Sequence, residues 1–269
     1  MPRQRDKPLP QDGFIFFGDS FSRIFGLVQH PQVGIKAYKG GSAKGLTKET
    51  NENRKDIAET LASRPDTQCA IFVFGNVDVH MSYYFLRHGR DPPESIDFNK
   101  IAKEYIAFIA GLPGEELKRI VIGCYPSSLI EPESVPQSLE AYGVLTEDQA
   151  KTIELSDCTL EKRQGRARAF NAALRAACEG LQWPESEMVE YIDIFDDLVD
   201  PDTLQLRPDY LDISTCNIHV VWETTILKWL EKFEWLAERV PEGFKEKMQG
   251  SLKAYLQEKT AELAAKDIS

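Results

Sequence analysis

The sequence predicts an α/β protein in three layers, with helices covering both faces of a parallel β-sheet. Short apolar runs alternate along the chain with segments of helical periodicity. The runs are apolar on both faces, as expected of strands buried between helices. With 269 residues and a hydrophobic content of 42%, the chain is long enough to enclose one full core. Together these observations favour a single α/β domain over two small ones.

Five apolar runs are flanked by turn or polar residues and are candidate strands. Right-handed crossovers bring the carboxyl ends of such strands to one edge of the sheet, so the loops after them should converge there. Helical spacing predicts a helix after each of the first four runs. The expected strands are 14–17, 34–38, 70–74, 119–123 and 189–194, and the expected helices are 21–28, 53–63, 98–111 and 159–180.

Two segments depart from this alternation. Residues 129–156 contain two prolines and many polar side chains, and we interpret them either as a lid over the active edge or as a surface loop. Residues 1–240 are expected to form the α/β domain with this insertion. Residues 241–269 are expected to form an amphipathic helix that packs on the domain or on a second copy of the chain, as a homodimer.

Charge and composition exclude several classes of function. The formal net charge is −11, whereas nucleic-acid binding requires a basic surface. No apolar stretch approaches the roughly 20 residues that span a bilayer, and no secretory signal is recognisable, so we expect a cytoplasmic protein that does not bind membranes. The five cysteines are widely spaced without a C-x-x-C pair, which predicts reduced thiols and no metal site.

The first candidate for chemistry is Ser20, in the segment "GFIFFGDSFSRIFG" that runs from Gly13 to Gly26. A serine at a strand-to-helix turn has two readings. It can act as the N-cap of the following helix, or as a nucleophile if a base lies within hydrogen-bond reach. Of the four histidines, His30 and His88 look like loop or surface residues, whereas His80 follows the third strand and His219 follows the last strand and precedes an apolar helix.

The order of these motifs resembles the SGNH, or GDSL-type, hydrolase superfamily over residues 13–236. The resemblance rests on Gly18-Asp19-Ser20 after the first strand, a glycine turn after the second, Gly75 with Asn76 and Asp78 after the third, and the late His219. It implies a flavodoxin-like α/β/α fold of about five parallel strands. It also implies a serine esterase, acyl hydrolase or acyltransferase without metal or organic cofactor, for which we expect a small ester or an O-acylated metabolite or sugar as substrate.

In this resemblance Ser20 is the nucleophile and His219 the base, while the backbone N–H groups of Ser20 and Gly41 stabilise the oxyanion. Two positions depart from the family pattern. Strict register puts Val77 where the family has an asparagine donor, so either Asn76 swings in or that donor is absent.

The second departure concerns the acid that usually precedes the histidine by three residues, which is Cys216 here. Asp212 could reach His219 through a longer loop, or a backbone carbonyl could orient the imidazole. Cys216 as a nucleophile paired with His219 is a third alternative.

Further residues after the strands are candidates for substrate contact. Asp19 is expected to support the turn beside Ser20. Asp78 and His80 lie at the mouth of the expected site, where His80 could bind substrate, serve as a second base or be an ordinary loop histidine. Tyr83 and Tyr125 are expected either to line an aromatic substrate wall or to belong to the core.

Three functions are therefore open. The first is a serine hydrolase or acyltransferase with Ser20 and His219. The second is an enzyme of the same fold that performs acid–base chemistry, such as a cyclisation, elimination or isomerisation, without an acyl-enzyme. The third is a binding protein in which Ser20 and His219 lie beyond hydrogen-bond distance.

Overall fold

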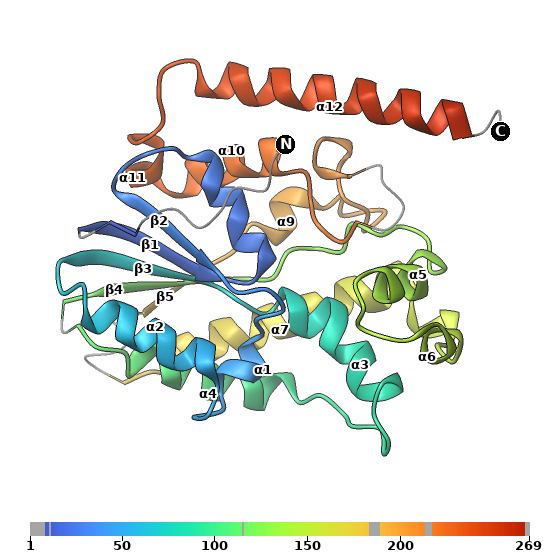
Figure 1. Cartoon of the computed structure of the whole chain (residues 1–269), viewed down its shortest axis with the longest axis horizontal. Coiled ribbons are helices and arrows are strands. Elements are labelled where there is room, and N and C mark those ends of the chain that lie inside the picture. The colour runs from blue at the N-terminus through green and yellow to red at the C-terminus, as the bar shows by residue number, and fades with distance from the viewer. Residues whose placement is uncertain (1–8, 11, 115, 183–188, 213–216, 267–269) are drawn as a thin grey trace.

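The computed structural model describes residues 9–10, 12–114, 116–182, 189–212 and 217–266, with side chains up to residue 258 of the last helix. Its centre is a parallel sheet in the order β2-β1-β3-β4-β5 (Figure 1). This confirms the predicted fold class, including the five strands. The strands are β1 (Gly13–Gly18), β2 (Val33–Ala37), β3 (Thr67–Val73), β4 (Lys118–Ile122) and β5 (Val189–Ile192).

The last strand is shorter than the sequence suggested. The apolar alternation predicts a strand to residue 194, but β5 ends at Ile192. Asp193 follows it, and its carboxylate accepts a hydrogen bond at 3.1 Å from the N–H of Phe195, where α9 (Phe195–Leu198) begins. The side-chain bond to the backbone starts a turn and so stops the strand.

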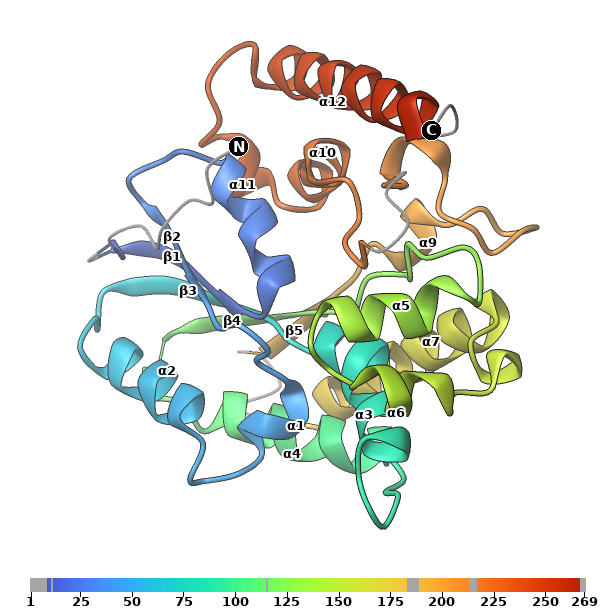
Figure 2. The ribbon, with the colours of Figure 1, turned by 45° about the vertical axis from the view of Figure 1, so that its right-hand side comes forward.

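Helices cover both faces of the sheet, and the alternation of β1 shows how the two cores are separated (Figures 1 and 2). Phe14 and Phe16 pack into one core, and Ile15 and Phe17 into the other. The second core is covered by α1 (Ala43–Leu46), α2 (Glu52–Ala62), α4 (Phe98–Ala110) and α7 (Leu160–Glu179).

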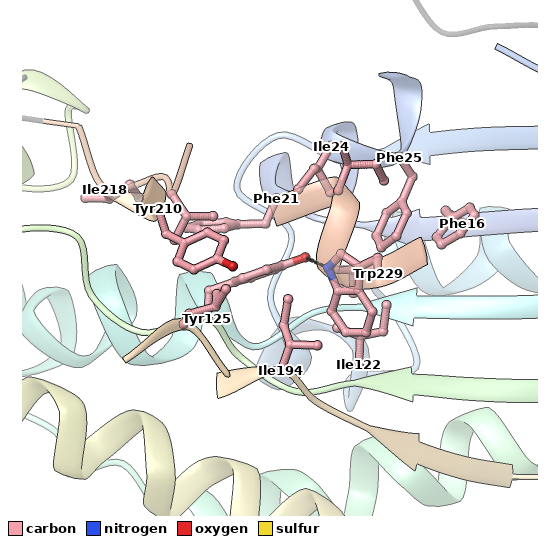
Figure 3. Packing of buried hydrophobic residues seen from close by; sticks show 14 of the residues in the cluster. Phe16, Phe21, Ile24, Phe25, Ile122, Tyr125, Ile194, Tyr210, Ile218 and Trp229 are labelled. Carbon is pink, nitrogen blue, oxygen red and sulfur yellow. Dashed lines mark hydrogen bonds between the residues drawn. The ribbon is translucent and has the colours of Figure 1, made fainter. Parts of the chain in front are cut away.

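The first core is covered by η1 (Ser20–Leu27), α10 (Trp222–Lys232), α11 (Glu234–Ala237) and the first turns of α12 (Phe244–Lys266). Trp229 of α10 is completely buried there, beside Phe16 and Phe25 (Figure 3). The helix predicted over 21–28 is a 3₁₀-helix, η1, which has i→i+3 hydrogen bonds at both its start and its end.

The insertion at 129–156 is helical. It contains α5 (Ser134–Ala141) and α6 (Glu147–Lys151), and it continues into η3 (Leu155–Asp157) beside α3 (Tyr83–His88), which follows a short π-helix, η2 (Asp78–Ser82). Arg163 of α7 holds the start of the insertion, because its guanidinium donates to the carbonyls of Leu129 at 2.6 Å and Ile130 at 3.1 Å.

The C-terminal helix α12 packs on the domain. Phe244 and Met248 in its first turns are buried, and α12 runs over α10 (Figure 1). Further along, the hydroxyl of Tyr255 donates a hydrogen bond to Asp212 at 2.6 Å. No helix within the described ranges is both long enough and apolar enough to cross a membrane.

Candidate active site

Ser20 lies at the junction of β1 and η1. Asp19 precedes it and is the N-cap of η1, because its carboxylate accepts a hydrogen bond from the Phe21 N–H at 2.9 Å. Gly18 is needed in this turn, since a Cβ there would lie 2.6 Å from the carbonyl oxygen of Val73. The reading of Ser20 as the N-cap is therefore wrong. Its hydroxyl is left available for another partner.

That partner is an imidazole from a distant part of the chain. Ser20 Oγ lies 2.8 Å from His219 Nε2, although 199 positions separate the two residues in sequence. His219 belongs to the loop that enters α10, and α10 packs against η1. The contact is short enough for the imidazole to take the hydroxyl proton.

Asn217 orients the imidazole. Its Oδ1 lies 3.0 Å from His219 Nδ1 and accepts the His219 backbone N–H at 3.1 Å. Its Nδ2 donates to Asp212 Oδ2 at 2.5 Å. Because a carboxylate only accepts, Nδ2 must face Asp212 and Oδ1 must face the imidazole. His219 then carries its proton on Nδ1 and presents a free lone pair at Nε2 to Ser20.

Asp212 therefore acts on His219 through Asn217. Asp212 Oδ2 accepts from Asn217 and Asp212 Oδ1 accepts from Tyr255 of α12. A hydrogen-bonded chain thus runs from α12 through Asp212, Asn217 and His219 to Ser20. We expected Asp212 to contact His219 directly, but the side-chain amide of Asn217 lies between the two and bonds to both. Cys216, the other residue considered for this role, lies outside the described residues.

Burial determines the protonation state of the imidazole. Desolvation lowers the pKa of His219 to about 4, the negative charge of Asp212 acts in the opposite direction, and the positive charge of Arg23 lowers the pKa further. His219 is consequently neutral at pH 7, which is the form that can accept a proton from Ser20.

Aromatic rings surround the imidazole. The ring of Phe21 lies 4.4 Å from that of His219, centroid to centroid. Tyr142, from the end of the insertion's helix α5, lies at 6.4 Å, and Trp222 at the start of α10 lies at 6.3 Å. The hydroxyl of Tyr142 also donates to Asn217 Oδ1 at 3.3 Å. The insertion therefore reaches the residue that orients His219.

The expected oxyanion donors are used elsewhere. The Gly41 N–H donates to the carbonyl of Tyr38 at 3.0 Å, closing the turn after β2. The amide of Asn76 is buried; its Nδ2 donates to Asp19 at 3.4 Å and its Oδ1 accepts the Tyr125 N–H at 2.8 Å. The expectation that Gly41 and Asn76 present free N–H groups to substrate is therefore wrong for this conformation.

The buried carboxylates of Asp19 and Asp78 accept hydrogen bonds from backbone N–H groups. Asp78 accepts hydrogen bonds from the N–H groups of Ala43 at 2.7 Å and Lys44 at 3.0 Å, which fixes the loop after β2. Burial raises the pKa of Asp78 to about 6 and that of Asp19 to about 7, in each case against hydrogen bonds that lower it. Both side chains are fully buried, so neither is exposed to substrate, and the bond from the Phe21 N–H to Asp19 confirms that Asp19 supports the turn beside Ser20.

His80 is also packed inside. Its Nε2 lies 3.1 Å from the carbonyl oxygen of Tyr125, and only 8% of its surface is exposed. Desolvation lowers its pKa to about 4. Of its three readings, the structure favours the ordinary buried histidine, because its position leaves little surface for substrate.

The two tyrosines belong to packing. Tyr125 is buried, and its hydroxyl accepts a hydrogen bond from Trp229 Nε1 at 2.7 Å (Figure 3). Tyr83 donates to Asp157 Oδ2 at 3.0 Å and lies under the guanidinium of Arg166. Tyr125 therefore has the core position that was the alternative for it, where its ring stacks on that of Phe21.

Three residues near His219 were not identified from the sequence: Asn217, Tyr142 and Tyr255. Asn217 could have been found, since it lies two residues before the proposed base and can accept from Nδ1. Tyr142 and Tyr255 carry no local signal, because their contacts depend on where α5 and α12 pack.

No group of three His, Cys, Asp or Glu side chains in the described part of the chain could hold a metal ion. A hollow of about 660 Å³ lies beside β5, where Arg175, Tyr191 and Lys232 are among its lining residues. None of the residues around Ser20 lines it, so we do not assign the chemistry to that hollow.

Comparison with known proteins supports the fold. No family model and no curated protein matches the sequence. Among solved structures, a candidate acylhydrolase from Bacteroides fragilis has a TM-score of 0.51 at 10% identity, covering 86% of this chain and 90% of its own. This likeness is one of fold alone: the two chains share a similar α/β arrangement over most of their lengths.

Two further structures are similar at lower scores. A GDSL-like lipase from Bacteroides thetaiotaomicron has a TM-score of 0.46 at 11% identity, covering 86% of this chain and 90% of its own. An aryl esterase from M. smegmatis has a TM-score of 0.43 at 8% identity, covering 82% of this chain and 99% of its own.

Proposed function

We propose that this chain is a serine-dependent esterase, acyl hydrolase or acyltransferase of the SGNH type that acts on a small ester or an O-acylated metabolite or sugar. The single observation that carries the proposal is the 2.8 Å contact between Ser20 Oγ and His219 Nε2, with Asn217 on the opposite ring nitrogen. The third alternative, a binding protein, requires Ser20 and His219 to lie beyond hydrogen-bond distance, which this contact contradicts.

In the first half of the reaction, Ser20 Oγ attacks the ester carbonyl carbon while its proton passes to His219 Nε2. The imidazolium that forms keeps its Nδ1–H on Asn217, and the charge of Asp212 behind Asn217 stabilises it. Collapse of the tetrahedral intermediate breaks the bond to the alcohol oxygen. His219 returns the proton to that oxygen, so the alcohol leaves neutral and Ser20 carries the acyl group.

In the second half, water or an acceptor alcohol attacks the acyl-Ser20 carbonyl and gives its proton to His219. Collapse of this intermediate breaks the bond between the acyl carbon and Ser20 Oγ, the acid or the new ester leaves, and His219 returns the proton to Oγ. The oxyanion of each intermediate can be bound by the Ser20 N–H. This group is the first N–H of η1 and has no acceptor within the described residues. One such donor typically contributes about 3 kcal/mol to transition-state stabilisation.

A second candidate is acid–base chemistry without an acyl-enzyme, such as a cyclisation, elimination or isomerisation. It is favoured by one observation: the Gly41 N–H and the Asn76 amide, both expected as oxyanion donors, have other partners. Such a reaction needs the neutral His219 as its base, but it does not need a covalent bond to Ser20.

A fluorophosphonate probe separates the candidates. For a serine hydrolase we expect labelling of the wild-type chain, complete loss of labelling in Ser20→Ala, and a loss on the order of 10³-fold or more in His219→Gln. Ser22→Ala is the matched control, since Ser22 Oγ is buried and bonds to the Asp19 carbonyl. A wild-type chain that stays unlabelled between pH 6 and 9 would refute the first proposal and leave the second.

A further inference from the structure

Arg23 lies on the same face of η1 as Ser20. Residues three apart on a 3₁₀-helix eclipse one another, about 6 Å apart along the axis. The burial of the first turns of η1 agrees with this spacing, because Ser20 and Arg23 are partly exposed whereas Phe21, Ser22, Ile24 and Phe25 are buried. The Arg23 side chain therefore leaves the helix on the side where the Ser20 hydroxyl meets His219.

The Arg23 guanidinium has no protein partner among the described residues. No hydrogen bond, ion pair or ring contact involves it. Every other arginine in the described ranges donates to a carbonyl, a hydroxyl or a carboxylate. A half-buried guanidinium with five N–H donors and a permanent charge is thus left over beside the candidate nucleophile.

The charge of Arg23 acts within the site. It is one of the causes that lower the pKa of His219, which places it in electrostatic range of the imidazole. Asp212, the acid that also acts on His219, is already bonded to Asn217 and Tyr255. A bound anion would therefore give the Arg23 guanidinium the hydrogen-bond acceptor that the described part of the protein does not supply.

We propose that Arg23 is a specificity-determining residue that binds a carboxylate or phosphate carried by the substrate, a few bonds from the ester carbonyl. The substrate class is then a short acyl ester with an anionic end, and this inference rests on the proposed function. Guanidinium binds both anions through paired N–H···O bonds, and the spacing along η1 suits a spacer of a few atoms. Since the chain has a net charge of −11, long-range attraction cannot supply this preference, and a local cation is required.

The kinetic test compares esters that share a leaving group. Mono-4-nitrophenyl glutarate and 4-nitrophenyl pentanoate differ mainly in the terminal carboxylate, and 4-nitrophenyl 4-phosphonobutanoate tests a phosphonate in the same place. The rate of ester hydrolysis measured with Ser20→Ala protein is subtracted as the background. The readout is the ratio of kcat/KM for each anionic ester to that for the neutral one, because any effect of Arg23 on His219 cancels in this ratio.

We expect the ratio to fall at least tenfold in Arg23→Gln and to be partly retained in Arg23→Lys. Arg168→Gln is the matched control, since it removes the same charge from α7 on the other face of the sheet, and the ratio should not change. If the kcat/KM ratio falls more for the glutarate ester, the preferred anion is a carboxylate; if it falls more for the phosphonobutanoate ester, the preferred anion is a phosphate. Hydrolysis of these esters with the same ratio in wild type and Arg23→Gln would overturn the inference and leave the proposed function intact.

If no ester is hydrolysed, binding decides the question separately. Ser20→Ala protein with ¹³C-labelled histidine is titrated with glutarate and with inorganic phosphate, and the His219 resonance is followed. Saturable shifts that disappear in Ser20→Ala/Arg23→Gln would support the anion site while the hydrolase proposal fails. Shifts that are unaffected by Arg23→Gln, or no shift with either anion, would overturn it.

Discussion

Exchanging the side chains of Asn217 and Asp212 should raise the pKa of His219. The double variant Asn217→Asp/Asp212→Asn keeps the hydrogen-bonded chain, because the new amide at 212 can donate to 217 and accept from the hydroxyl of Tyr255. It moves the negative charge to the position that lies 3.0 Å from His219 Nδ1. The net charge of the protein does not change.

The size of the effect follows from the contact that is created. Burial holds the pKa of His219 at about 4 in the wild-type chain, where Asp212 acts only through an intervening amide. A carboxylate in direct contact with a titrating group shifts its pKa by roughly one to three units. The double variant should therefore titrate between about pH 5 and 7, which corresponds to about 1.4 kcal/mol per unit in favour of the imidazolium.

The assay is an NMR pH titration of ¹³Cε1-labelled histidine. The chain has four histidines, and His219→Gln assigns the resonance of interest. Asp212→Asn alone is the control, and it should lower the His219 pKa because it removes a negative charge that raises it. In the active protein, the acid limb of fluorophosphonate labelling should move upward with the titration. A double variant whose His219 still titrates near pH 4, or a rise in Asp212→Asn, would refute the proposed electrostatic path.

Three further predictions address the packing around the site. Tyr255→Phe removes a hydrogen bond to Asp212, so it should lower the free energy of unfolding by about 1 kcal/mol. It should also shift the NMR resonance of His219, and an unshifted resonance would show that α12 does not influence the imidazole. Gly18→Ala puts a Cβ 2.6 Å from the Val73 carbonyl oxygen and should cost about 1–3 kcal/mol in urea unfolding, whereas unchanged stability would contradict the close packing of the turn. His80 and His219 both have folded pKa values of about 4, below the usual 6.5, so the unfolded state binds protons first and stability should fall as pH drops from 6.5 to 4. His80→Gln should reduce that slope in denaturation curves, and an equal slope would show that His80 does not contribute to it.

Local patterns predicted most of the layered fold. The apolar runs located all five strands, with ends that differ from the predicted ones by at most three residues, and after β5 the side chain of Asp193 accounts for the difference. The segment after Ser20 was correctly expected to be helical, but its 3₁₀ geometry was not. The repeat of a 3₁₀-helix, three residues per turn, and that of an α-helix, about 3.6 residues per turn, are hard to distinguish in a segment of two turns.

Residue types were poorer guides to roles than to positions. Asp78, His80 and Tyr125 do follow the expected strands, but all three are buried and bond to other parts of the protein. A polar residue at the carboxyl end of a strand can point toward substrate or support the loops behind it. Sequence alone does not distinguish these, because the choice depends on which backbone N–H groups lie nearby.

The sequence by itself determined the order of strands and helices and brought Ser20 and His219 into consideration as a pair, since periodicity and motif order are local properties of the chain. Folding was needed to see that Asp19 rather than Ser20 caps η1, that Asn217 rather than Asp212 contacts the imidazole, and that Arg23 has no partner among the described residues. Each of these depends on hydrogen-bond geometry between segments that meet only after folding. A difference of one or two ångströms there decides which donor is bound and which is free.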